Sequence, residues 1–154
     1  MPPAEPTIDA DSAARLRGVV ARLSRQFNRF ATLAGLTPSQ ASALGVVAHR
    51  GPLTIGELTR IEGLNPTMVS RVVGRLDELG LIERRAHPED QRAAIVEATA
   101  QGRELSTRIA GERAAVLAAV LAELERADRD QILAALPAFE RLEARLLARG
   151  EPRG

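Results

Sequence analysis

Residues 65–85 of the chain read NPTMVSRVVGRLDELGLIERR, and no other segment says more about the fold. Asn65 offers an oxygen acceptor at the start of a helix, and Pro66, which lacks an N–H, suits its first position. Four apolar residues share one face of that helix, namely Val69, Val72, Val73 and Leu76. Gly80 ends the helix, and the pattern that follows predicts a strand. The stretch therefore predicts a short helix with one buried face and one polar, arginine-bearing face, followed at once by a hairpin.

Three further helices are predicted upstream of this stretch. The first is expected over 12–35, the second over 37–51, where Thr-Pro opens the pattern, and a compact third over 55–62. The first helix carries an apolar seam spaced alternately four and three apart, Leu16, Val20, Leu23, Phe27, Phe30 and Ala34. Gly63 allows positive φ after the third helix, so 55–80 reads as a helix-turn-helix.

Downstream, two short strands around a polar tip are predicted over 81–98, and a long helix over 99–125. Asp128 with Gln131 resembles a capping box that would start the last helix, and Pro137 is expected to kink it. The predicted fold is mainly α with a small β-hairpin wing: a winged helix-turn-helix with about six helices.

Composition narrows the class of protein. The chain has 154 residues, 45% hydrophobic and 27% charged, which is typical of one globular domain. Without cysteine there are no disulfides, thiolate zinc sites or thiol redox switches. No apolar run approaches the roughly 18 residues that cross a bilayer, and no signal peptide opens the chain, so we expect a cytoplasmic protein without membrane contact. His49 and His87 lack metal-ligand spacing, so we predict no metal and no cofactor.

Charge is distributed unevenly along the chain. All 21 basic residues are arginine, but the net charge is only +1, so bulk charge does not indicate a nucleic-acid partner. No acidic residue lies between Asp11 and Glu57. Within that interval Arg15, Arg22 and Arg29 recur every seven residues and form one stripe. The stripe pairs with glutamates across a dimer, namely Glu104, Glu112, Glu140 or Glu143, or it lines an anionic ligand site or flanks DNA.

The polar face of the 66–79 helix carries the candidate DNA-reading residues. A helix about 10–12 Å across enters a major groove when its outer side is short, polar and basic. Thr67 and Ser70 allow close approach, Arg71 can reach a base edge or a phosphate, and Arg75 is placed for the backbone. The alternative is that these arginines only solubilise the helix by pairing with nearby acids, Asp77 and Glu78.

The predicted hairpin carries more arginine. Asp90 precedes Arg92 by two residues and can hold its guanidinium extended for a narrow minor groove. Arg84 is expected to meet a phosphate or the solvent rather than a base. For Arg85, an inward salt bridge and an outward position are equally open.

Together these segments resemble the MarR family, the multiple-antibiotic-resistance type of winged helix-turn-helix regulators. The resemblance lies in TPSQASALGVVAHRGPLTIGEL, VSRVVGRLDELGLIERR and PEDQRAAIVEATAQG. Asp90-Gln91-Arg92 matches the Asp-x-Arg of the family's wing, and Thr99 to Gly102 matches its Thr-x-x-Gly helix start. The likeness runs over about 12–148. Three residues depart from the family pattern, namely Thr59, Glu62 and Ala98.

The resemblance implies a homodimer that places two recognition helices roughly 34 Å apart on a pseudo-palindromic operator. The implied organisation is a flexible tail over 1–11, a dimerisation region over 12–36 and 103–148, and a DNA-binding lobe over 37–102. The implied DNA-binding residues are Asn65, Pro66, Thr67, Ser70, Arg71, Arg75, Arg84, Asp90 and Arg92. Family members are mostly repressors, many released by small phenolic or other lipophilic ligands, which here implies a pocket near Phe27, Phe30, His49 and Arg50.

The predicted function is a sequence-specific DNA-binding transcriptional regulator, most often a repressor in this family, whose partners are double-stranded DNA, a second copy and a small-molecule effector. A winged-helix protein-interaction module is the alternative, because the same fold serves other partners. An enzyme is not expected, because the sequence has no Gly-x-Ser-x-Gly, Walker loop, His-Glu-x-x-His or dinucleotide fingerprint.

Overall fold

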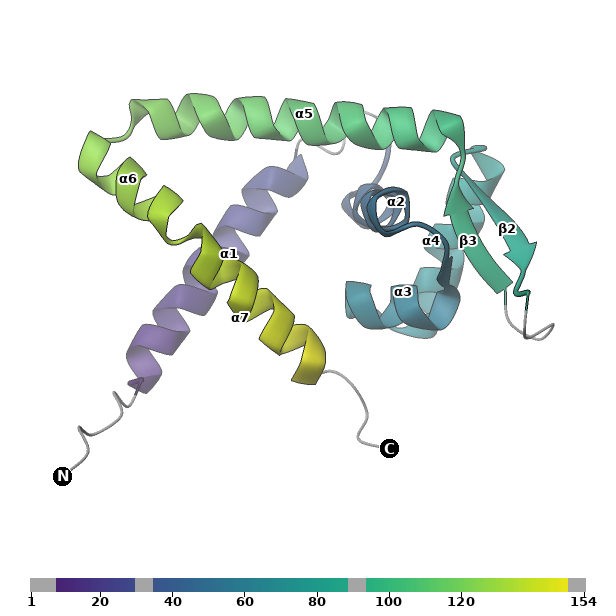
Figure 1. Ribbon diagram of the computed structural model, residues 1–154, viewed down its shortest axis with the longest axis horizontal. Coiled ribbons are helices and arrows are strands. Elements are labelled where there is room, and N and C mark those ends of the chain that lie inside the picture. The colour runs from purple at the N-terminus through teal and green to yellow at the C-terminus, as the bar shows by residue number, and fades with distance from the viewer. Residues whose placement is uncertain (1–7, 30–34, 89–93, 150–154) are drawn as a thin grey trace.

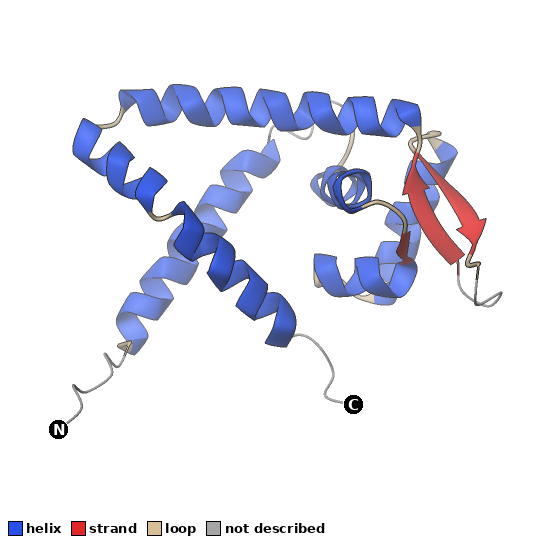
Figure 2. Ribbon diagram, viewed as in Figure 1, coloured by secondary structure: helices blue, strands red, loops and turns tan. Residues whose placement is uncertain are grey.

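The computed structural model describes residues 8–29, 35–88 and 94–149, which form seven helices and a three-stranded sheet (Figures 1 and 2). The helices are α1 (Ala10–Arg29), α2 (Pro38–Arg50), α3 (Ile55–Glu62), α4 (Pro66–Glu78), α5 (Ala100–Glu123), α6 (Arg126–Ala134) and α7 (Leu136–Arg149). The strands are β1 (Leu53–Thr54), β2 (Ile82–Ala86) and β3 (Ala94–Ala98). The predicted class, mainly helical with a small winged sheet, is confirmed.

Four of the helices begin where a side-chain oxygen caps them. The capping residues of α2, α3, α4 and α5 are Thr37, Thr54, Asn65 and Thr99. Each accepts a hydrogen bond from a backbone N–H three residues later, which has no partner within the helix. Such signals are local, and three of the four caps, all but Thr54, were predicted.

The end of the chain differs from the prediction. The predicted capping box at Asp128 is wrong, because α6 already begins at Arg126 and Asp128 lies in its first turn. Instead of a kink in one helix, α6 ends at Ala134 and α7 begins at Leu136. Pro137 causes this break, since it has no N–H to continue the ladder but fits the first turn of a new helix.

The sheet has one more strand than predicted. The strand order is β1-β3-β2, and both pairings are antiparallel. β1 is only two residues long, with Leu53 opposite Val96. On the face that includes Val96, the side chains of Ile82 and Ala98 are also buried. The sheet therefore covers the helices α2, α3 and α4 with one face and leaves the other to solvent.

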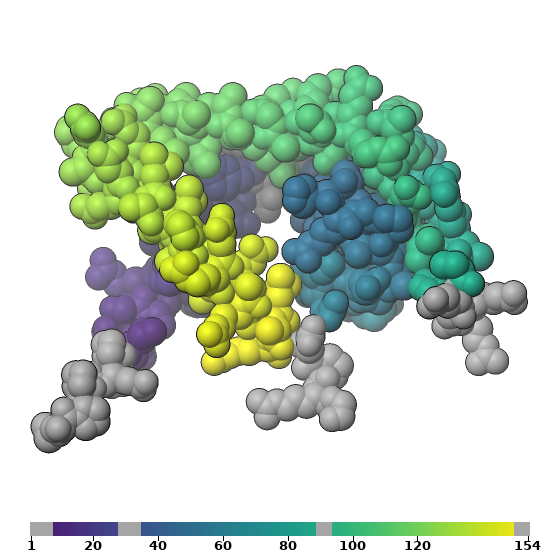
Figure 3. Space-filling view, viewed as in Figure 1, coloured from purple at the N-terminus to yellow at the C-terminus, as the bar shows by residue number. Residues whose placement is uncertain are grey.

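Every buried hydrophobic residue that the structure describes lies within residues 36–109, here called the compact lobe. The fully buried side chains at its centre are Leu44, Leu58, Leu76, Ile82, Val47, Val69, Val73 and Val96. By contrast, the arm helices α1, α6 and α7 expose large apolar side chains, among them Leu16, Val20, Leu23, Ile132, Leu133, Leu136, Phe139, Leu142 and Leu146. α5 runs over both parts and joins them (Figure 3).

A close contact fixes the start of α5 to the end of α4. Gly102 packs so tightly that a Cβ there would overlap the carbonyl oxygen of Leu81. That same oxygen accepts from the N–H of Thr99 at 3.1 Å, and the Thr99 hydroxyl donates to the carbonyl of Gly80 at 2.7 Å. The Thr-x-x-Gly pattern thus provides the cap and the missing side chain that this junction requires.

Candidate nucleic-acid interface

The turn between α3 and α4 places the second helix at the surface. Gly63 has φ 62° and ψ 22°, a left-handed conformation that glycine adopts without a steric penalty. Its N–H donates to the carbonyl of Thr59 at 3.0 Å, which closes α3. Leu64 then packs against the core, and α4 starts two residues later. The predicted helix-turn-helix is present.

α4 has two faces of opposite character. Val69, Val72, Val73 and Leu76 are buried, as their spacing predicts. Thr67, Ser70, Arg71 and Arg75 are exposed on the other side. The structure therefore gathers these four predicted DNA-binding residues on one solvent face of a single helix.

Asn65 and Pro66 shape the start of α4. The amide oxygen of Asn65 accepts from the N–H of Met68 at 2.8 Å, and Pro66 occupies the first helical position. The Asn65 oxygen is therefore engaged in capping, and its amide nitrogen remains for an outside contact. Met68 is 45% exposed beside the polar face.

The two arginines of α4 differ in their partners. Arg75 donates through Nη1 to Oε2 of Glu78 at 2.9 Å, and both side chains are more than half exposed. Arg71 forms no hydrogen bond or ion pair with any residue that the structure describes. The alternative of a paired surface arginine therefore applies to Arg75 and not to Arg71. An exposed pair of this kind is weak, at about 0–1 kcal/mol, so a phosphate can replace Glu78.

The arginines of β2 point to opposite sides of the sheet. Arg85 pairs with Glu83 and, at 3.4 Å between Nη1 and Oε2, with Glu97, and the hydrogen bond to Glu83 raises the pKa of Arg85. Arg85 is therefore on the outer face and not in an inward salt bridge. Arg84 is on the inner face, where its Nε lies 3.5 Å from Oδ2 of Asp77 on α4.

Three predicted site residues lie outside the described part of the chain: Asp90 and Arg92 for DNA, and Phe30 for a ligand. Asp77 and Gly74, by contrast, were not predicted as site residues, although both lie beside the Arg84 guanidinium. The helical spacing of 74 and 77 could have placed them on one side of α4, but only the sheet register brings Arg84 to them.

Two carboxylates hold the motif in shape. Glu57 accepts from the Thr54 N–H at 2.7 Å and from its hydroxyl at 2.8 Å, and these bonds lower the pKa of Glu57. Glu62, which was expected to depart from the pattern of the family that the sequence resembles, accepts from the Ser42 hydroxyl at 3.0 Å, and burial raises its pKa. The departure at Glu62 is thus accommodated by a bond between α2 and α3.

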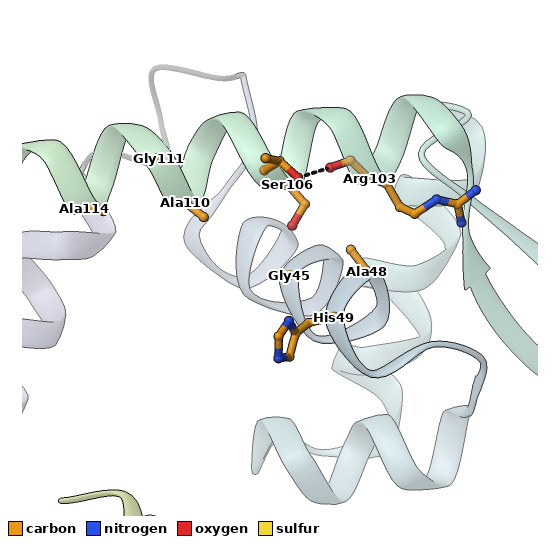
Figure 4. A pocket seen from close by; sticks show the side chains of 9 residues that line it. Gly45, Ala48, His49, Arg103, Ser106, Ala110, Gly111 and Ala114 are labelled. Carbon is orange, nitrogen blue, oxygen red and sulfur yellow. Dashed lines mark hydrogen bonds between the residues drawn. The ribbon is translucent and has the colours of Figure 1, made fainter. Parts of the chain in front are cut away.

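A cleft of about 690 Å³ opens between α2 and α5 (Figure 4). Its lining residues are Gly45, Ala48, His49, Arg103, Ser106, Thr107, Ala110, Gly111 and Ala114. Small side chains create the space, and His49 and Ser106 supply polar groups. The Arg103 guanidinium is directed toward the sheet, where it donates to the carbonyl of Ala98 (Figure 4).

The predicted ligand residues do not gather in this cleft. His49 lines it, whereas Arg50 is exposed and is not among its lining residues. Phe27 lines a separate apolar groove of about 410 Å³, which α1 forms with Ile132, Leu136 and Phe139. That groove is part of the exposed apolar surface of the arm helices.

Within the described residues, no three histidine, cysteine or acidic side chains are placed to hold a metal ion. Nor does this part of the chain contain a helix with the length and apolar character needed to span a bilayer.

Comparison with known proteins relates this geometry to a family. A model of the MarR family matches residues 34–93. A Mycobacterium bovis protein named as an uncharacterized HTH-type transcriptional regulator is 36% identical over 122 residues, which cover 79% of this chain and 85% of the relative. Wild-type MarR from Escherichia coli superposes with a TM-score of 0.73 at 22% identity, covering 87% of this chain and 97% of MarR. NadR, solved in complex with 4-hydroxyphenylacetate, gives 0.70 at 22% identity, covering 93% and 98%.

Proposed function

The chain belongs to the MarR family and is an HTH-type, DNA-binding transcriptional regulator, and from that premise we propose that it is a homodimeric repressor of a pseudo-palindromic operator. The observation that carries the proposal is the exposed polar face of α4, with Arg71 unpaired among the described residues. A helix with short polar side chains and a projecting arginine fits a major groove. In that position Arg71 reads a base edge, and Arg75 meets a phosphate beside it.

The homodimer is proposed from the arm helices. Their exposed apolar residues include Val20 and Leu23 on α1 and Phe139 and Leu142 on α7, each 42–50% exposed. A contiguous apolar surface of this kind marks an interface. We assign it to a second copy, because the same arms on both chains form a self-complementary two-fold contact, which sets two α4 helices on successive turns of DNA.

The cleft between α2 and α5 is the proposed effector site. Its volume of about 690 Å³ lies within the usual range for small-molecule pockets, about 300–1,000 Å³. Small residues would admit an aromatic ring, and His49 and Ser106 would bind a phenol or carboxylate. The fold neighbour solved with 4-hydroxyphenylacetate motivates that ligand class. A ligand that binds one spacing of the helices better than another shifts the dimer out of register with the operator.

The regulator assignment also implies that the protein acts in the cytoplasm with its DNA and carries out no catalysis. A winged-helix protein-interaction module remains the competing function. The two differ in salt dependence, because DNA binding releases phosphate counterions and weakens steeply with salt, whereas a protein interface need not.

The test is selection of fragmented host DNA by the purified protein, followed by titration of the recovered sequence at several salt concentrations. The wild type should recover a short two-fold symmetric sequence. Arg71→Ala should weaken operator binding by about 1–3 kcal/mol and relax the preference at one position of each half-site. Arg126→Ala, which removes a guanidinium 87% exposed on α6, is the matched control and should leave binding unchanged. Salt-independent recovery without a common sequence would refute the proposal.

A further inference from the structure

Arg84 leaves the sheet on the side that faces α4. In the β2–β3 pairing it lies directly opposite Val96, and residues opposite each other in antiparallel strands share a face. Val96 is fully buried, and Ile82, two residues before Arg84, is buried on the same face. The stem of Arg84 therefore continues the core-facing row of β2, and its charged end emerges at the edge of that row against α4.

The guanidinium then lies over a gap in the surface of α4. Gly74 follows Ser70 by four residues, so it lies one turn further along the polar face. It has no side chain, and Nη2 of Arg84 lies 3.7 Å from the position that a Cβ would occupy. The polar face of α4 thus includes a positive charge that its own sequence does not provide.

Asp77 anchors this guanidinium from one side only. Its Oδ2 lies 3.5 Å from Nε of Arg84, and the two side chains are 44% and 41% exposed. In the described part of the chain Arg84 has no other ion pair or hydrogen bond. An acid at Nε orients the planar group while Nη1 and Nη2 remain able to donate outward, which is the geometry that binds a phosphate.

Arg85, the next residue in β2, differs from Arg84 in its ion pairs. Arg85 lies on the outer face of the sheet and is engaged by two carboxylates, Glu83 and Glu97. Two arginines adjacent in sequence are therefore in opposite situations. One is directed onto the polar face of α4 with two nitrogens unengaged by described residues, and the other is neutralised away from it.

We propose that Arg84, although carried by the wing, is a phosphate-binding residue of the α4 surface, that Gly74 leaves the opening for it, and that Asp77 is the positioning residue that aims it. This inference rests on the proposed function, DNA binding through α4. The inference thus gives a role in DNA binding to Gly74, which has no side chain, and to Asp77, whose charge is negative like that of DNA.

The experiment compares operator and random-sequence DNA binding of four proteins, the wild type, Arg84→Met, Arg85→Met and Asp77→Asn, over a range of salt concentrations. Arg84→Met keeps the apolar stem and removes the charge. It should weaken both DNAs about tenfold and reduce the slope of log affinity against log salt by about 0.9, the loss of one phosphate contact. Arg85→Met, the matched control, should change neither quantity.

Asp77→Asn is the more informative variant, because the two explanations predict opposite changes in DNA affinity. Removing a negative charge from a DNA-facing surface should tighten binding on charge alone. If Asp77 aims Arg84, operator binding should instead weaken about threefold to tenfold. In the Arg84→Met background the same change should no longer weaken binding, because the residue that it positions is gone.

The outcomes distinguish failure of the Arg84 inference from failure of the proposed DNA-binding function. Equal thermal melting of all variants checks that the fold persists, as expected for an exposed pair. Salt-sensitive DNA binding that Arg84→Met leaves unchanged, or that Asp77→Asn tightens in the wild-type background, overturns this inference alone. A wild type that binds no DNA in a salt-dependent manner overturns the proposed function together with the inference.

Discussion

Leu76 in α4 and Leu133 in α6 are the same side chain in opposite surroundings, with 0% and 46% of their surface exposed. The same difference in burial separates the compact lobe from the arm helices. The compact lobe buries its apolar residues within one chain, whereas the arm helices leave theirs open. The long helix α5 passes from one condition to the other, from Ile109, which is 4% exposed, to Val120, which is 50% exposed. One region is thus closed within a single chain, and the other leaves apolar side chains uncovered by it.

Truncating each of the two leucines should affect the two regions very differently. Leu76→Ala should lower the free energy of unfolding by about 2–5 kcal/mol, because it opens a cavity in a closed core. Leu133→Ala should change the unfolding of the isolated chain by no more than about 0.5 kcal/mol, and should weaken self-association instead. Urea unfolding and sedimentation velocity measure the two quantities. Equal destabilisation by both, with association unchanged, would show that the arms are already complete in one chain.

A smaller effect tests the junction that joins the regions. Gly102→Ala places a methyl group against the Leu81 carbonyl, and overpacking of this kind costs about 1–3 kcal/mol or more. Gly111→Ala on the same helix is the control, since nothing lies within 4 Å of the added methyl group. It should be neutral or stabilise by up to about 1 kcal/mol. Thermal melting followed by circular dichroism distinguishes them, and equal melting temperatures would contradict the close contact.

The smallest effect concerns a helix start inside the compact lobe. Thr54→Ala removes a capping hydroxyl and should cost about 1 kcal/mol at neutral pH. The Thr54 N–H and hydroxyl lower the pKa of Glu57 in the folded chain, so their contribution is present above the pKa of an unfolded glutamate, about 4.3, and is lost as the pH falls through the lowered value. The difference between Thr54→Ala and wild type should therefore shrink in acid. A difference that stays constant from pH 7 to pH 3 would rule out the carboxylate's part in the cap.

The sequence predicts the compact lobe well because its signals are local. Proline at a first helical position, a threonine or asparagine before it, and glycine after the last turn each act within a few residues. The arms were predicted less well at Pro137, where the pattern of apolar residues continues but the backbone divides into α6 and α7. β1 was not predicted, since two residues are too few for an alternation to be recognised.

The candidate site is harder to predict than the helices, because the directions of its side chains depend on tertiary structure. The faces of α4 follow from helical spacing, whereas the directions of Arg84 and Arg85 follow from the register between β2 and β3. A shift of one residue in that register would exchange the two, so the sequence leaves both directions open. Likewise, His49 and Phe27 line different hollows because the packing of α2 and α1 against their neighbours is not encoded in their spacing.

The uninterrupted course of α5 has a geometric consequence. Its 24 residues extend about 36 Å at 1.5 Å per residue, from the junction at Gly102 to the beginning of α6. A helix held rigidly at one end behaves as a lever, and a tilt of about 5° over that length displaces the far end by about 3 Å. That displacement is close to the rise of one base pair, about 3.4 Å along each strand. A small rotation about the Gly102 junction is therefore magnified along α5 into a displacement of about one base-pair step at its far end.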